Sequence, residues 1–199
     1  MRFDSIDDIE RLIAHRVAEA PSLEFKRELP FETSGQKLEA LKDLTAMGNG
    51  GGGTVLYGLD EEQNEWPVAA AVTPLTDRSL VSRLEDVVRD AVRPPLLWTL
   101  GVIEGAGGYL LAADVEPSPL GPYMVQAYGN LRYHRRIGRR TEPMAEQQVR
   151  DAADVDDLEV RIGRGLDPDQ FRIWADSSAH GVEVGHVDQA EVNPVVGDY

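Results

Sequence analysis

The sequence predicts an α+β fold with a mixed or antiparallel sheet, three to four helices and a short acidic C-terminal extension. Two observations indicate this class. Amphipathic runs with helical spacing and alternating runs typical of strands both occur along the chain. They do not succeed one another as regular strand–helix–strand units. A length of 199 residues suits one domain with a substantial core. We therefore expect a domain over residues 1–155 and an acidic extension over 156–199, formed of short strands or partly disordered.

The N-terminal half predicts a helix, a strand, a second helix and a second strand. Ser5 is an N-cap residue ahead of apolar residues at helical spacing, and Pro21 ends this first helix. The next residues alternate, so that Glu24 and Lys26 share one face of a strand. A second amphipathic run is followed by glycines and then by an apolar strand. The expected bounds are 5–19, 22–29, 34–48 and 54–60, with a loop from there to residue 76.

The C-terminal half predicts a helix, a hairpin, two short strands and a last helix. Pro94 and Pro95 end the third helix, and two glycines join the strands of the hairpin. A Tyr-Gly-Asn turn separates the next two strands, and Pro143 suits the first turn of the last helix. The expected bounds are 77–92, 96–105, 109–115, 123–127, 130–138 and 142–155.

Composition excludes several classes of protein. The chain has no cysteine, which excludes a disulfide framework and thiolate chemistry. No apolar run reaches the roughly 18 to 20 residues that span a bilayer, and the first residues lack the pattern of a signal peptide. The four histidines show no metal-ligand spacing. We expect a cytoplasmic protein with no membrane partner and no haem, flavin or zinc.

Charge is unevenly distributed along the chain. The formal net charge is −15, which opposes indiscriminate binding to nucleic acid. Residues 132–140, however, hold five arginines and no acid. Residues 151–199 hold twelve Asp or Glu and three Arg. Because charge effects decay over roughly 8 Å at physiological salt, the arginine cluster can act locally.

A run of glycines separates the second helix from the strand that follows it. Gly48, Gly50 and Gly53 formally match G-x-G-x-x-G, but that fingerprint requires a strand before it and a helix after it. The Lys and Ser/Thr of a Walker loop are also missing after Gly58. We expect the run to end the helix and to let the backbone approach a strand or a ligand closely. The loop consists of Asn49, Gly50, Gly51, Gly52 and Gly53.

Several short motifs occur in a fixed order over about residues 15–150. They are Glu24-Phe25-Lys26, Ala46-Met47-Gly48-Asn49 with the glycines, Gly58-Leu59-Asp60-Glu61, and the set Tyr133, Arg136, Gly138, Thr141 and Met144. This ordered set resembles the Schlafen AlbA-type domain. The resemblance implies a mixed α+β domain that binds RNA or DNA. Because Schlafens pair two such modules, it also implies that a single module can form a homodimer.

The resemblance further implies a set of site residues. Some members of the family cleave tRNA or rRNA with three carboxylates, whose counterparts here are Glu19, Glu24 and Glu61, the last replacing the usual Asp. Oxygen ligands without His or Cys suit Mg²⁺ or Mn²⁺, so a metal site would comprise Glu19, Glu24, Asp60 and Glu61. Nucleic-acid contacts would come from Lys26, Arg132, Arg135, Arg136, Arg139 and Arg140.

Other interpretations of these residues stay open. Acidic residues are so frequent that a five-residue spacing of Glu19 and Glu24 also arises by chance, as solvated or structural carboxylates. The arginines can instead bind the acidic extension, which would then act as an autoinhibitor, or the acids of a partner. The alternatives to a metal-dependent endoribonuclease are therefore a non-catalytic DNA-binding or nucleotide-binding regulatory domain and a protein-interaction or self-association module.

Overall fold

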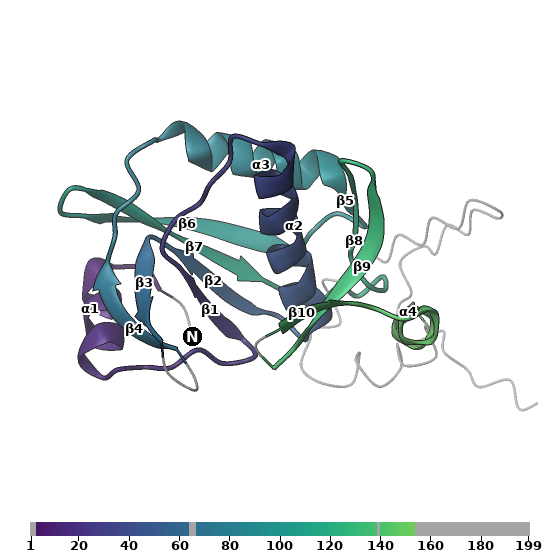
Figure 1. Cartoon of the computed structure of the whole chain (residues 1–199), viewed down its shortest axis with the longest axis horizontal. Coiled ribbons are helices and arrows are strands. Elements are labelled where there is room, and N and C mark those ends of the chain that lie inside the picture. The colour runs from purple at the N-terminus through teal and green to yellow at the C-terminus, as the bar shows by residue number, and fades with distance from the viewer. Residues whose placement is uncertain (1–2, 64–66, 139, 154–199) are drawn as a thin grey trace, which may run out of the picture. The chain divides into compact units, whose positions relative to one another are not determined.

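A computed structural model of the chain describes residues 3–63, 67–138 and 140–153, which form the α+β fold that the sequence predicts (Figure 1). The helices are α1 (Ile6–Ala14), α2 (Ser34–Asn49), α3 (Ser79–Ala91) and α4 (Glu146–Ala153). The strands are β1 (Leu23–Lys26), β2 (Gly53–Tyr57), β3 (Leu59–Glu62), β4 (Val68–Val72), β5 (Val92–Arg93), β6 (Trp98–Gly105), β7 (Gly108–Val115), β8 (Met124–Ala127), β9 (Asn130–Ile137) and β10 (Arg140–Pro143). The predicted extension, 156–199, lies outside the described residues, so the domain boundary stays a prediction.

The main sheet has the strand order β1-β2-β7-β6. β1 pairs with β2 in parallel, and the other neighbours are antiparallel. The two central strands are buried on both faces. In β2, for example, Val55 and Tyr57 belong to one core and Leu56 to the other. Burial on both faces explains why β2 and β7 are almost continuously apolar and do not alternate between apolar and polar residues.

Helices and a small hairpin cover the two faces of this sheet. α2 and α3 supply Leu41, Leu44 and Leu84 to the first core. On the opposite face, α1 supplies Ile9 and Leu12 to the second core, which also contains residues of β3 and β4 (Figure 1). None of the helices in the described part is long and apolar enough to cross a membrane.

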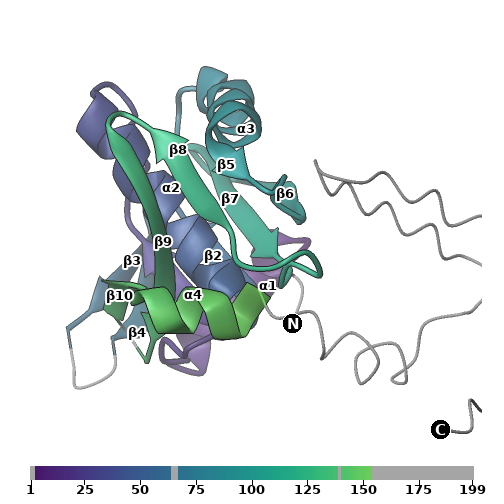
Figure 2. The same ribbon diagram turned by 90° about the vertical axis from the view of Figure 1, so that its right-hand side faces the viewer.

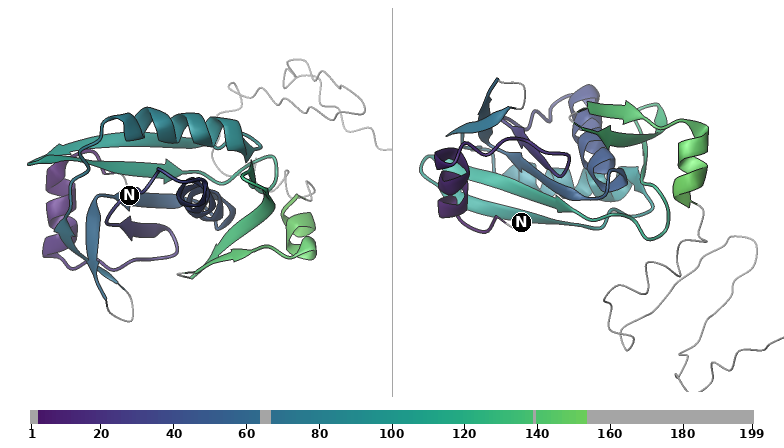
Figure 3. Two further views of the ribbon diagram at one scale, coloured as in Figure 1. Left: turned by 45° about the horizontal axis from the view of Figure 1, so that its top comes forward. Right: turned by 90° about the horizontal axis from the view of Figure 1, so that it is seen from below.

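A second sheet, of order β10-β9-β8-β5, is antiparallel throughout. α2 contacts β8, β9 and β10 as well as β2 and β7, so it lies between the two sheets (Figure 3, left). In Figure 2 the β8–β9 pair crosses in front of α2, with α4 at its lower end. The second sheet therefore brings the arginine-rich strand β9 back to the end of α2.

Four predicted bounds are corrected by the structure. The first helix ends at Ala14, not at residue 19, because Arg16 adopts a positive φ of 50°. Gly58, with φ +90°, breaks the strand predicted over 54–60 into β2 and β3. β3 pairs with β4, which lies in the predicted loop. Pro143 ends β10 and does not begin a helix, and such an edge strand tolerates proline.

Candidate functional site

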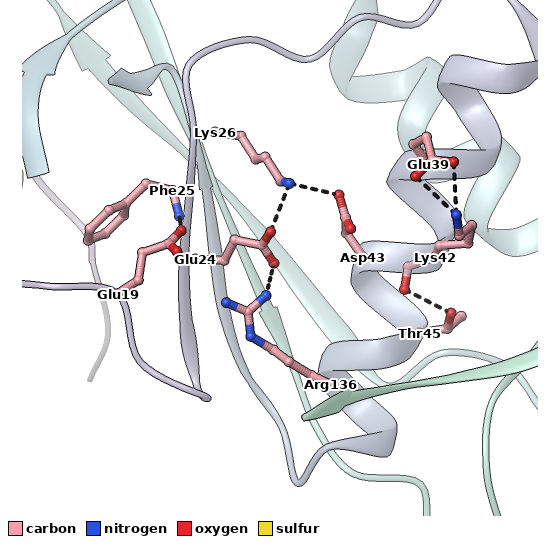
Figure 4. A network of polar contacts seen from close by, with 9 residues as sticks. All are labelled: Glu19, Glu24, Phe25, Lys26, Glu39, Lys42, Asp43, Thr45 and Arg136. Carbon is pink, nitrogen blue, oxygen red and sulfur yellow. Dashed lines mark hydrogen bonds and ion pairs between the residues drawn. The ribbon is translucent and has the colours of Figure 1, made fainter. Parts of the chain in front are cut away.

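A buried ion pair joins the two sheets. Glu24 of β1 accepts a hydrogen bond at Oε2 from Nη1 of Arg136 on β9 (Figure 4). Glu24 is 8% exposed and Arg136 is 5% exposed. The other guanidinium nitrogens of Arg136, Nε and Nη2, are buried and have no hydrogen-bond partner among the described residues. Because a buried charge is stable only when paired, Glu24 and Arg136 depend on each other.

Lys26 extends this pair into a network with α2. Its ammonium lies 2.8 Å from Oε1 of Glu24 and 3.2 Å from Oδ2 of Asp43 (Figure 4). Burial favours a lower pKa for Lys26, but Asp43 and Glu24 raise that pKa above its ordinary value. Burial and the charge of Glu24 together raise the pKa of Asp43 to about 6, against the opposing effect of Lys26. Lys26 is thus held by two carboxylates.

Glu19 lies beside this network, in the extended segment before β1. Its Oε1 accepts a hydrogen bond of 2.8 Å from the backbone N–H of Phe25. Burial raises the pKa of Glu19, and the charges of Glu61 and Glu24 raise it further, whereas the Phe25 hydrogen bond and Arg136 act against this rise. Glu24 and Glu61 are therefore both close enough to Glu19 to affect its ionisation.

The contacts of Asp60 do not involve the side chains of these three carboxylates. Its Oδ2 is 3.6 Å from Nη1 of Arg27, and its Oδ1 accepts a hydrogen bond from the backbone N–H of Glu61. The break at Gly58 places Asp60 and Glu61 on β3, which is not a strand of the main sheet. The cation beside Asp60 is thus Arg27, which the sequence did not mark as a site residue.

The arrangement does not fit a divalent metal as it stands. Among the described residues no group of three or more His, Asp or Glu side chains is placed to hold a metal ion. Both oxygens of Glu24 already face cations, Lys26 and Arg136. A metal ligated by Glu24 would have to displace one of them.

The predicted arginines divide between two faces of β9. Residues alternate along the strand, so Arg132, His134 and Arg136 share the face toward α2, whereas Arg135 lies on the other. Arg140 of β10 pairs with Ile137 and so shares the outer face with Arg135. Arg132, Arg135 and Arg140 are exposed. The prediction for Arg139 falls outside the described residues.

The glycine loop has the structural role that the sequence predicts. α2 ends at Asn49, and Gly51, Gly52 and Gly53 all have positive φ. A Cβ atom at Gly53 would lie 2.3 Å from the carbonyl oxygen of Ser22, so only glycine permits this approach to the start of β1. The loop thus brings β2 against β1 and thereby positions Glu24.

Asn49 is a structural connection between α2 and the second sheet. Its amide donates hydrogen bonds to the carbonyls of Tyr123 and His134, at 2.8 and 2.7 Å. Its Oδ1 accepts one from the backbone N–H of Tyr123 at 2.7 Å. The side chain therefore fixes β8 and β9 at the end of α2.

Two participants in the network were not found from the sequence. Asp43 lies in the middle of α2, and no sequence motif marks it. Only its position next to the buried face of the helix suggests a role. Tyr57 of β2 is buried, and its hydroxyl has no hydrogen-bond partner in the part of the chain that the structure describes. Its pKa is raised by burial and by the charges of Asp43 and Glu24. Both residues depend on tertiary neighbours that sequence spacing does not reveal.

Known structures similar to this chain are distant in sequence. A crystal structure of a Corynebacterium diphtheriae protein is 14% identical with a TM-score of 0.46, and the match covers 82% of this chain and 29% of that one. The chain thus spans less than a third of the length of that protein. A second match is the solution structure of an N-terminal domain from Nitrosomonas europaea, described as related to the ATP-dependent DNA helicase RecG. It is 18% identical with a TM-score of 0.41, covering 59% of this chain and 75% of that domain.

Sequence comparison gives a more specific result. No curated protein matches the chain. The family described as Schlafen, AlbA_2 matches residues 19–145, which is more than half of the chain. The matched region includes the network around Glu24, the glycine loop and the β9–β10 hairpin. The chain therefore belongs to the Schlafen AlbA_2 family, as its ordered motifs predict.

Proposed function

We propose that this chain is a nucleic-acid-binding domain whose contact surface is the β9–β10 hairpin. The observation that carries the proposal is the exposure and the lack of ion pairs of three arginines, Arg132, Arg135 and Arg140. All three are exposed, and in the part of the chain that the structure describes none has a carboxylate within ion-pair distance. The family relationship supports the same class of ligand.

The other arginines of the described part are engaged. Arg93 donates to backbone carbonyls of α3 and of Val92. The rest are paired as Arg11–Asp8, Arg16–Glu62, Arg27–Asp60, Arg78–Glu104, Arg83–Glu32, Arg89–Asp86, Arg136–Glu24 and Arg150–Glu146. In a chain of net charge −15, the arginines of the described part that pair with neither a carboxylate nor a backbone carbonyl gather on one hairpin. These are the cations most readily available to phosphates.

The outer face of the hairpin carries aromatic and apolar side chains as well as arginines. Tyr133 and Arg135 lie on this face of β9, together with Leu131, which is 72% exposed, and Ile137. Aromatic side chains beside cations suit single-stranded nucleic acid, because the bases stack while the phosphates meet the cations. We therefore favour a single strand or a single-stranded region of structured RNA as the ligand.

The test is the salt dependence of binding. We expect a fluorescein-labelled single-stranded RNA to bind the wild type with an affinity that falls as salt rises. The double variant R135A/R140A is expected to bind more weakly, with a log K against log salt slope that is shallower by about 0.7 per arginine for a single strand. R78A/R89A is the matched control, because it removes the same charge from arginines that are paired elsewhere. Equal affinities and slopes for the two double variants would contradict the proposal.

Metal-dependent cleavage of tRNA or structured RNA is the second candidate, and it would require a metal to displace Lys26 or Arg136 from Glu24. It is favoured by the electrostatic coupling of Glu19 with Glu61 and Glu24, the three positions that the family resemblance marks. The test is incubation of a tRNA mixture with Mg²⁺ or Mn²⁺, comparing the wild type with E19Q. Metal-dependent cutting that E19Q loses would support a nuclease. Binding without cutting in the wild type would leave the domain as a recognition module.

Two further interpretations concern assembly. If the acidic extension occupies the hairpin as a phosphate mimic, removing residues 156–199 is expected to increase RNA affinity. If two domains pair to form a groove, light scattering at high micromolar concentration is expected to give the mass of a homodimer. No gain in affinity, or a monomer mass, would dismiss the corresponding interpretation.

A further inference from the structure

A cavity of about 340 Å³ lies between α2 and the β9–β10 hairpin. This volume is at the lower end of the range of small-molecule sites, which is about 300 to 1,000 Å³. The cavity is separate from the Glu24 network, whose residues do not line it. Its polar and aromatic lining residues are Lys42, Tyr128, Asn130, Arg132, His134 and Thr141.

Two buried polar atoms of this lining have no hydrogen-bond partner among the residues that the structure describes. They are Oδ1 of Asn130 and Nδ1 of His134, whose side chain belongs to a residue that is only 3% exposed. Most buried polar side-chain atoms in proteins are bonded, because an unpaired one loses its hydration without compensation. Both residues line the cavity, so a ligand that carries hydrogen-bonding groups would satisfy these atoms once the two side chains turn toward it.

His134 offers a neutral ring to such a ligand. Burial lowers its pKa, and the charges of Lys42 and Arg132 lower it further, against a weaker opposite effect of Glu39. A neutral imidazole has one N–H donor and one acceptor nitrogen. With the amide of Asn130, the lining thus includes donors and acceptors that suit the edge of a heterocycle.

The charges of the lining are all positive. Lys42 and Arg132 line the cavity, and none of its described lining residues carries a carboxylate. Arg132 has no ion pair in the described part of the chain. Lys42 lies 2.9 Å from Oε1 of Glu39, whose side chain is 66% exposed (Figure 4). Such an exposed pair contributes little, so an incoming anion can take the place of Glu39.

Tyr128 contributes an aromatic side chain in an unusual backbone conformation. It has a φ of 54°, and Gly129 after it has a φ of +74°, in the two-residue turn between β8 and β9. Asn and Gly are the residues usually found at both central positions of a two-residue turn with positive φ, so a tyrosine at the first position is an outlier. The residue is 44% exposed and lines the cavity. Nucleobases stack readily on exposed aromatic side chains.

We propose that this cavity binds one nucleotide, with the base against Asn130, His134 and Tyr128 and the phosphate at Lys42 and Arg132. The nucleotide can be a base turned out of a bound strand or a free mononucleotide, since both present the same groups. The inference rests on the proposed nucleic-acid function and gives it a defined subsite. In this proposal the inner face of β9 binds a base, whereas its outer face contacts the rest of the nucleic-acid strand.

The test compares an intact single-stranded RNA with a strand of equal length that has the sugar–phosphate backbone but no bases. We expect N130A to bind the intact strand about 5- to 10-fold more weakly than the wild type, and the abasic strand within 2-fold of it. Because Oδ1 of Asn130 has no partner among the described residues, N130A loses no hydrogen bond made by that oxygen there, and it is expected to unfold at a urea concentration no lower than that of the wild type. The matched control is Q63A, which truncates an exposed amide that neither lines the cavity nor belongs to the second sheet.

A site-specific measurement accompanies the affinities. The ring ¹⁵N signals of His134, assigned by their loss in H134Q, are expected to shift saturably when the intact strand is added, and not with the abasic strand. The same shift with AMP, GMP, CMP or UMP alone would identify free mononucleotides as a source of the ligand, and a shift with strands only would identify a turned-out base. Equal shifts with intact and abasic strands, or unchanged binding by N130A, would overturn the subsite.

These outcomes are separable from those of the proposed function. If R135A/R140A weakens strand binding while N130A does not and the His134 signals stay unchanged, the domain binds nucleic acid without this subsite. If the wild type binds neither strand nor mononucleotide, both proposals fail.

Discussion

Glu24 of β1 and Arg136 of β9 form a buried ion pair between residues 112 positions apart in the sequence. The pair connects the main sheet to the second sheet, and Lys26 and Asp43 complete a network of two acids and two bases. Its charges balance, which allows them to remain in the interior.

We expect removal of one partner to be much more damaging than removal of both. R136M would leave Glu24 facing Lys26 alone, and E24Q would leave the guanidinium without a counter-charge. Breaking a buried pair in this way typically costs about 3 to 5 kcal/mol of unfolding free energy. The double variant E24Q/R136M is expected to recover part of this loss in urea unfolding. A double variant whose loss equals the sum of the two single losses would show that the residues act independently.

The raised pKa of Asp43 predicts a pH dependence of stability. Its pKa of about 6 exceeds the ordinary value of 3.8, because burial and Glu24 disfavour its ionised form in the folded protein. Stability from this group is therefore complete below about pH 4 and is lost as pH rises through about 6. The loss is at most about 3 kcal/mol for a shift of about two units. In urea unfolding, the wild type should lose stability relative to D43N between pH 4 and 7. A difference between the two proteins that does not change with pH would refute this assignment.

The glycine loop allows a matched pair of alanine substitutions. G53A meets both a positive φ and the carbonyl oxygen of Ser22, which its Cβ would approach to 2.3 Å. G51A meets a positive φ alone, because nothing lies within 4 Å of its Cβ. We expect G53A to lower the unfolding free energy by about 1 to 3 kcal/mol more than G51A, as overpacking typically does. Equal losses would mean that conformation alone requires these glycines.

The hydrogen bonds of Asn49 can be tested by measuring hydrogen exchange at a single backbone amide. N49A removes the acceptor of the Tyr123 N–H, so this amide should lose protection against hydrogen exchange. N49D keeps an acceptor for Tyr123 but loses both bonds that its amide donates to carbonyls. We expect both variants to be less stable, by about 2 to 4 kcal/mol for N49A, and only N49A to expose the Tyr123 amide locally. Faster exchange of that amide in N49D would show that the carbonyl bonds, and not Oδ1, hold the strand.

Local patterns were sufficient for much of the fold. The two-residue period of a strand predicts that Glu24 and Lys26 share a face, and their ion pair is consistent with that prediction. The hairpin of β6 and β7, the amphipathic helices and the helix stop at the glycines also follow from sequence spacing alone. These features depend on neighbours within a few residues, which a single sequence contains.

The rest depends on which elements meet in three dimensions. β4 reads Val-Ala-Ala-Ala-Val and shows neither strand alternation nor a helical stripe, and its partners are β3 and a bridge from Ala18 to Val68. Alternation groups Arg132, His134 and Arg136 on one face of β9 but does not say that this face is buried against α2. The engagement of Glu24 by Arg136, and hence the poor fit to a metal, follows from that packing. The candidate carboxylates were therefore predicted, but their counter-charges were not.

The alternation of β9 also makes the strand sensitive to insertion and deletion. Removing one residue before Arg136 would exchange the two faces, bringing Arg135 or Ile137 toward Glu24 and carrying His134 out of the cavity lining. Substitutions change one contact at a time, whereas such a slip would disrupt the ion pair, the cavity and the outer arginines together. The length of the turn at Tyr128 and Gly129 therefore constrains the domain as strongly as any of its side chains.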